Sequence, residues 1–282
     1  MKNPLPALAR HGGAALALAA ALALSTPAGA AATDASFGEL VDQAALIPPG
    51  PHDSAMLAKV AEAVGFLKRM DLPHAQQAVN EALQLDDRNT WLHVLNGFVY
   101  HLQARQGDAQ RTSLAIEGYQ QALRLDPGNS IAQEFLGLAY MDMRQFDRAR
   151  DAFAAALMLT PDSRTSLSGL MVSSYLTGDA DTACAMADQF RRTAGPLPAS
   201  FLRSSVAVYA SCRDFTQADR MRQRLASADG DAPDVRQADR RLARWKAFYD
   251  RQAADGAAPQ PASFSTDASG ARPEMLAQAF PL

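Results

Sequence analysis

The sequence predicts an all-α protein built as a solenoid of antiparallel helix pairs. The strongest evidence is an internal repeat in which four residues recur 34 positions later: Ala115, Tyr119, Ala122 and Pro127 return as Ala149, Phe153, Ala156 and Pro161. Small residues at fixed steps and a closing proline are typical of stacked helical hairpins. The 282 residues, 48% hydrophobic and 20% charged, also suffice for a sizeable core.

The first thirty residues have the pattern of a secretory signal peptide. Lys2 and Arg10 precede an apolar run over 14–24, and small residues at 28–30 predict cleavage after Ala30. The run is shorter than the roughly 20 residues that span a bilayer, so a retained membrane anchor is the weaker alternative. Because arginine and alanine usage suggests a bacterial source, we expect a periplasmic protein, or alternatively a secreted one, without stable membrane insertion after cleavage.

The remaining segments follow in order along the chain. Residues 37–46 can form one short helix, which the prolines at 48–51 end. The first helix of the solenoid then begins at Asp53 or Ser54, because either side chain can accept amide hydrogen bonds of a new helix. The expected organisation is a signal peptide (1–30), a linker with a short helix (31–53), the solenoid (54–225), a capping helix (226–252) and a disordered tail rich in Ala and Pro (253–282).

The second helix pair contains an insertion. Gly97 and Gly137 are 40 residues apart, whereas the second helices of the same two pairs are offset by only 34. We therefore expect six extra residues in a loop at 106–111, between a helix that opens at Thr90 and one that spans 112–125. Loops tolerate such insertions, and a longer turn is the simplest interpretation.

The last three pairs span 130–161, 164–192 and 199–225. Pro161 is expected to end a helix, since proline lacks the amide hydrogen that the helix needs. In the fifth pair Arg222 replaces the aromatic residue of the second helix. Beyond it, an apolar stripe predicts an amphipathic helix that covers the end of the stack: Val235, Ala238, Leu242, Trp245 and Tyr249.

The repeated residues resemble the tetratricopeptide repeat family. The resemblance rests on Gly97 with Tyr100, on Gly137 with Tyr140, on the later alanines and on the Leu-Asp-Pro and Leu-Thr-Pro closings, and it covers about 55–225. It implies a right-handed superhelix whose first helices line a concave groove for extended peptides or partner helices. It implies no catalysis.

The family's groove positions can be carried over to this chain. They fall in the first helices of pairs two, three and four, and we expect a partner-binding groove lined by Trp91, Val94, Phe98, His101, Glu134, Leu138, Met141, Val172 and Tyr175. Ile131, Thr165 and Ser168 occupy further such positions. Members that clamp a C-terminal carboxylate carry Lys, Arg and Asn here, which this chain lacks, so an apolar or amphipathic protein segment is the expected ligand. The alternative is that these residues pack inward.

The two cysteines can be placed in the same register. Cys184 falls early in the second helix of pair four and Cys212 late in the first helix of pair five, toward the same end of adjacent antiparallel helices. An oxidising compartment favours pairing of two such thiols. We therefore expect a Cys184–Cys212 disulfide.

The sequence offers little support for chemistry or for a charged partner. The net charge of −3 gives no global case for nucleic acid. His93 and His101 lie two helical turns apart without a third ligand, and no zinc-protease motif, phosphate-binding glycine loop or nucleophilic triad is present. We expect no enzyme, no catalytic residues, no metal and no cofactor.

The expected function is that of a scaffold for a protein partner in envelope assembly, secretion or pilus biogenesis. Two alternatives stay open. The locally basic stretch 191–251 could meet an acidic polymer in exopolysaccharide export. The apolar end of the chain (Met275, Leu276, Phe280 and Leu282) could belong to an N-terminal arm of a larger secretion component.

Overall fold

The computed structural model describes residues 54–229 and 233–254. Within these two ranges the chain forms helices and no strand: α3 (Ser54–Lys68), α4 (Leu72–Leu85), α5 (Thr90–Arg105), α6 (Arg111–Leu125), α7 (Ser130–Asp142), α8 (Phe146–Leu159), α9 (Arg164–Thr177), α10 (Ala180–Arg192), α11 (Ala199–Ser211), α12 (Phe215–Asp229) and α13 (Pro233–Ala254). None of them is long and apolar enough to cross a membrane. The expected signal peptide, linker helix and tail lie outside the described residues.

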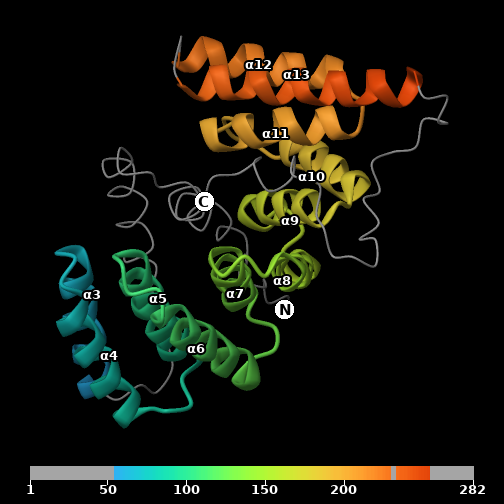
Figure 1. The fold of residues 1–282 in the computed structure, drawn as a ribbon. Helices are drawn as coiled ribbons and strands as arrows, with labels where there is room; N and C mark the ends of the chain where they lie inside the picture. Colours follow the sequence, from blue (N-terminus) through green and yellow to red (C-terminus); the bar gives the residue numbers. More distant parts are fainter. Residues whose placement is uncertain (1–53, 230–232, 255–282) are drawn as a thin grey trace, which may run out of the picture.

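The helices stack in chain order as a solenoid (Figure 1). Each of the pairs α3/α4, α5/α6, α7/α8, α9/α10 and α11/α12 packs together, and each second helix also contacts the first helix of the next pair. The first helices α5, α7, α9 and α11 touch one another in the same order. The all-α solenoid of helix pairs expected from the repeat is thereby confirmed. Because contacts join only near neighbours along the chain, the stability of such an array is close to a sum of local terms.

Side-chain caps and prolines set the helix boundaries. Asn89 accepts a hydrogen bond of 3.1 Å from the amide of Trp91 at the start of α5, and Asn129 caps α7 in the same way at 2.8 Å. At the other end, α8 stops at Leu159, two residues before Pro161. These boundaries follow from local residues alone, which is why the sequence predicts them closely.

One residue with positive φ reverses the chain inside every helix pair. Such a residue satisfies the end of the first helix by the left-handed conformation usual after a helix C-terminus. The five residues are Met70, Gly107, Arg144, Gly178 and Arg213. Every pair therefore keeps the same positive-φ turn, including the three pairs in which the residue is not glycine.

The insertion in the second pair is distributed rather than held in one loop. Helix α5 has 16 residues against 13 in α7, and α6 begins at Arg111, one position earlier than the repeat predicts. The connection itself, 106–110, is only slightly longer than the corresponding 143–145. The expectation of a six-residue loop is thus wrong in part, because some of the extra residues extend α5, where they gain helical hydrogen bonds. The longer α5 also brings Arg105 to the neighbouring pair.

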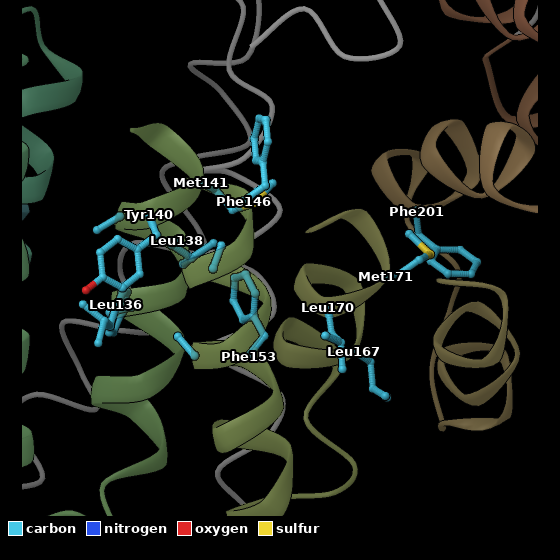
Figure 2. Packing of buried hydrophobic residues seen from close by; sticks show 14 of the residues in the cluster. Leu136, Leu138, Tyr140, Met141, Phe146, Phe153, Leu167, Leu170, Met171 and Phe201 are labelled. Carbon is cyan, nitrogen blue, oxygen red and sulfur yellow. The ribbon is translucent and has the colours of Figure 1, made fainter. Parts of the chain in front are cut away.

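The interior of the third pair is built around Phe153. Its side chain is fully buried and lies between α7 and α9 (Figure 2). A Cβ added at Gly137 of α7 would lie 2.8 Å from the Phe153 ring, and one added at Gly169 of α9 would lie 2.5 Å from it. The two glycines therefore admit the ring between consecutive first helices.

Helix α13 covers the end of the stack. Its apolar stripe, from Val235 to Tyr249, is buried, and the helix packs on α11 and α12. Trp245 meets Tyr175 of α9 edge to face at 6.4 Å. Arg222, which stands where pairs two and three have an aromatic residue, lies 3.4 Å from Asp239 of α13. This ion pair links the fifth helix pair to the capping helix.

Candidate functional site

Seven of the nine expected groove residues are buried in this structure. The apolar ones are Val94, Phe98, Leu138, Met141 and Tyr175, and all belong to the buried hydrophobic cluster. His101 and Glu134 are buried as well. Trp91 and Val172 remain half-buried. At the seven buried positions the structure agrees with the alternative of inward packing, and the assignment of the nine residues to a partner-binding groove stays a prediction.

Aromatic contacts between pairs two and three explain part of this burial. The ring of Phe98 in α5 lies 5.5 Å from the ring of Phe135 in α7, and Tyr119 of α6 stacks on Phe135 at 5.6 Å. These rings come from three different helices and fill the boundary between the two pairs. Phe98 thus contributes to the joint between repeats.

His101 belongs to a polar cluster at the same boundary. Its Nε2 lies 2.9 Å from Oδ2 of Asp142 in α7, and its Nδ1 lies 3.3 Å from the Tyr119 hydroxyl. Arg105 donates to both carboxylate oxygens of Asp142, at 3.0 and 2.8 Å. Burial acts to raise the pKa of Asp142, but the His101 hydrogen bond and the Arg105 charge outweigh it and hold the pKa below its ordinary value. The cluster joins α5, α6 and α7.

Glu134 forms a second buried polar link, between pairs three and four. Its Oε1 accepts hydrogen bonds from the hydroxyls of Ser163 and Ser166, the latter at 2.8 Å. Ser163 is also the N-cap of α9. Burial raises the pKa of Glu134, and the two serine hydrogen bonds oppose that shift only in part. Glu134 therefore positions the start of the next repeat.

Glu134 makes stability depend on pH. Because burial raises the pKa of Glu134 above the ordinary 4.5, the folded chain binds this proton more tightly than the unfolded chain does. Its stabilising contribution is complete below about pH 4.5 and is lost as the pH rises through the raised value. We expect Glu134→Gln to gain stability relative to the parent protein between pH 4 and pH 7, measured by urea unfolding at both. Exposed Glu117→Gln is the matched control, and parallel pH curves for Glu134→Gln and the parent would contradict this account.

The accessible part of the candidate groove lies toward the start of the first helices. Trp91 of α5, Ile131 of α7 and Ser168 of α9 are half-buried, as is Val172 one turn further along α9. Three of these four side chains are apolar, and none carries a charge. They can contact an apolar partner segment, and they offer no cation to hold a terminal carboxylate.

The structure joins Cys184 of α10 to Cys212 by a disulfide. Cys212 is the C-cap of α11, and the two Cα atoms are 6.7 Å apart. The bond therefore ties the fourth pair to the fifth. Among residues 54–229 and 233–254, no three His, Cys, Asp or Glu side chains are placed to hold a metal ion.

A hollow that the sequence pattern did not reveal lies between α10 and α12. It has a volume of about 460 Å³, and its walls carry Arg191, Arg220 and Arg224. The signal that could have found it is the pair Arg220 and Arg224, four residues apart on one helix face. The sequence does not show that Arg191 lies beside them, because Arg191 reaches the hollow only through the packing of the fourth helix pair on the fifth.

Comparisons with known proteins agree with the repeat geometry. The sequence model described as "Tetratricopeptide repeat" matches residues 105–171, from the end of α5 into α9. A curated relative is N-alpha-acetyltransferase 16, NatA auxiliary subunit, of Mus musculus, which is 32% identical over 119 residues. The aligned region covers 42% of this chain and 13% of the mouse protein, so the likeness is confined to a small part of that protein.

Solved structures share the fold across a larger part of the chain. PilF of Pseudomonas aeruginosa gives a TM-score of 0.57 at 20% identity, with 72% of this chain and 89% of PilF covered. YrrB gives 0.53 at 18% identity (63% and 88% covered), and MamA gives 0.52 at 18% identity (61% and 91% covered). The matched model identifies tetratricopeptide repeats at residues 105–171, and the helix pairs of the solenoid and these structures show the same fold over a larger part of the chain.

Proposed function

We propose that this protein is a periplasmic adaptor that holds a protein partner against its first helices during envelope assembly, secretion or pilus biogenesis. The observation that carries the proposal is the accessible lining of α5, α7 and α9. Trp91, Ile131 and Val172 are apolar and half-buried, and each comes from a different repeat. Together they suit an extended apolar or amphipathic segment that runs across several repeats.

Two further features support the proposal. YrrB, which shares the fold, is described as a protein with an unusual peptide-binding site, and we infer a ligand of the same kind here. The Cys184–Cys212 disulfide is typical of an oxidising compartment, which agrees with export through the signal peptide expected at 1–30.

Internal pairing weakens the alternative of exopolysaccharide export. Several basic side chains of the C-terminal region face carboxylates within the chain: Arg203 pairs with Asp234, and Lys246 lies 3.5 Å from Asp219. Such charges are partly neutralised before any polymer arrives. The basic stretch therefore offers an acidic polymer less free charge than its composition suggests.

Photocrosslinking in intact cells tests the adaptor proposal. A photoreactive residue placed at Trp91 or at Val172 is expected to give the same discrete protein adduct, identified by mass spectrometry. Met158, whose side chain is 86% exposed on the second helix α8, is the matched control position and is expected to give no such adduct. Equal labelling at all three positions, or no protein adduct at 91 and 172, would show that the first helices do not hold a partner.

A further inference from the structure

The hollow between α10 and α12 is lined on one side by a basic face of α12. Arg220 and Arg224 come from that helix, and Arg191 comes from the last turn of α10. None of the residues that line the hollow is acidic. All of them belong to second helices, so the hollow is separate from the lining of α5, α7 and α9.

The charges of Arg220 and Arg224 have no counterpart among the described residues. Like charges four residues apart on a helix repel each other, and this arrangement destabilises α12. The nearby carboxylate of Asp219 is occupied elsewhere, since it faces Arg222 at 3.8 Å and Lys246 at 3.5 Å. No carboxylate among the described residues therefore pairs with these two arginines, and their face of α12 is suited to an anionic ligand.

Arg191 is held in place on the opposite wall. Its Nη1 donates to Oδ1 of Asp188 at 2.9 Å and to the Tyr209 hydroxyl at 3.2 Å. The same hydroxyl donates to Asp188 at 2.8 Å. These bonds fix the guanidinium on this wall, where it is ion-paired with Asp188. A rigid arginine suits carboxylate recognition, because its planar fork loses little freedom on binding.

Gln217 adds an acceptor to this basic face. Its Oε1 is buried and has no hydrogen-bond partner in the described part of the chain. An unsatisfied buried acceptor is costly, so a ligand that donates an N–H there gains more than one that does not. Met221 supplies the apolar part of the lining, which can contact the methylene groups of a side chain.

We propose that this α10–α12 hollow binds an acidic segment of the protein partner, with Asp or Glu carboxylates on Arg220 and Arg224 and a backbone N–H on Gln217. The volume of about 460 Å³ is within the range of about 300–1,000 Å³ usual for ligand pockets. No aromatic side chain lines it to stack on a sugar ring, which favours a peptide over a glycan. The inference rests on the proposed function in one respect, that the partner is a protein.

Fluorescence anisotropy with a fluorescein-labelled hexaglutamate peptide tests the proposal on the purified full chain. Arg220→Gln/Arg224→Gln is expected to weaken binding about tenfold or more. Arg192→Gln/Arg240→Gln removes the same charge from exposed positions outside the hollow and is expected to weaken it less than about threefold. Gln217→Met is expected to weaken binding about threefold without any change of charge.

Several outcomes would overturn the proposal. Equal losses in the two double variants would show general attraction between charges, and unchanged binding of the Arg220/Arg224 variant would place the peptide elsewhere. Displacement of hexaglutamate by oligogalacturonate at a lower concentration than by unlabelled hexaglutamate would make the hollow a glycan site. The urea midpoint of Arg220→Gln/Arg224→Gln should equal or exceed that of the parent protein, because repulsion within α12 is relieved.

The outcome is separable from that of the adaptor proposal. Crosslinking through Trp91 reports on the first helices and does not depend on Arg220 or Arg224 being intact. An adduct at Trp91 with no specific hexaglutamate binding would refute the acidic-segment inference alone. Loss of the adduct with specific peptide binding retained would refute the groove alone.

Discussion

Phe153→Ala is expected to lower the free energy of unfolding by about 3–5 kcal/mol, as large buried aromatic side chains do when truncated. The ring is fully buried in α8 and fills the space between Gly137 of α7 and Gly169 of α9. Neither glycine carries a side chain that could close the cavity. Urea unfolding followed by circular dichroism measures the change, and a loss below about 1 kcal/mol would show that the third and fourth pairs do not depend on this ring.

The glycines allow a sharper version of the same test. A Cβ at Gly169 would lie 2.5 Å from Cζ of Phe153, so Gly169→Ala in the parent protein is expected to cost about 1–3 kcal/mol by overpacking. In the Phe153→Ala background the clash disappears. The same substitution should then stabilise α9, because alanine is favoured over glycine inside a helix by about 1 kcal/mol. A cost of equal size in both backgrounds would contradict direct packing of ring on glycine.

The glycine and aromatic positions also show how much of the fold can be predicted from the sequence alone. Gly97 stands against Tyr119 of its own pair as Gly137 stands against Phe153, with a Cβ-to-ring distance of 2.7 Å. Because the same glycine-to-ring contact occurs in the second and the third pair, the sequence reveals both the helix pairs and which faces meet. Gly169 makes the same kind of contact with Phe153 across the boundary between pairs three and four. The periodicity alone does not predict this contact.

The groove could not be predicted to the same depth. Whether a first-helix side chain is open depends on the rotation of each pair against the next, which no single repeat encodes. Phe98 is the clearest case, since its burial follows from Phe135 of the next pair. Arg105 is another, because its contact with Asp142 exists only through the extra turn of α5. The sequence alone therefore does not show which side chains of the first helices are exposed.

Each of these two boundaries between helix pairs has its own polar link, made by different residues. Asp142 with His101 joins pairs two and three, and Glu134 with Ser166 joins pairs three and four. Each link is buried in part, so removing one partner leaves a polar group without its hydrogen bond. Polar residues at groove positions therefore fix the relative placement of repeats, and the apolar half-buried residues are left for a partner.

Replacing both Cys184 and Cys212 by alanine is expected to lower the free energy of unfolding by roughly 3–4 kcal/mol. The bond closes a loop with a sequence separation of 28 residues, and the chain-entropy account gives a stabilisation of this size for such a loop. Urea unfolding of the oxidised parent, the reduced parent and the double variant measures it. The reduced parent should resemble the variant, and two free thiols in the unreduced, unfolded parent would contradict the disulfide.

The position of the disulfide predicts which helices lose stability when it is reduced. The connection between α10 and α11, 193–198, is longer than the other connections between pairs, such as 126–129 and 160–163. Arg164 already fastens it by donating to the carbonyls of Ala194 and Pro196, at 3.1 and 2.6 Å. In a solenoid with only local contacts, reduction should loosen pairs four and five before the rest. Hydrogen exchange is therefore expected to quicken in α10–α12 on reduction while α5–α8 keep their protection, and uniform quickening would mean that the array unfolds as one unit.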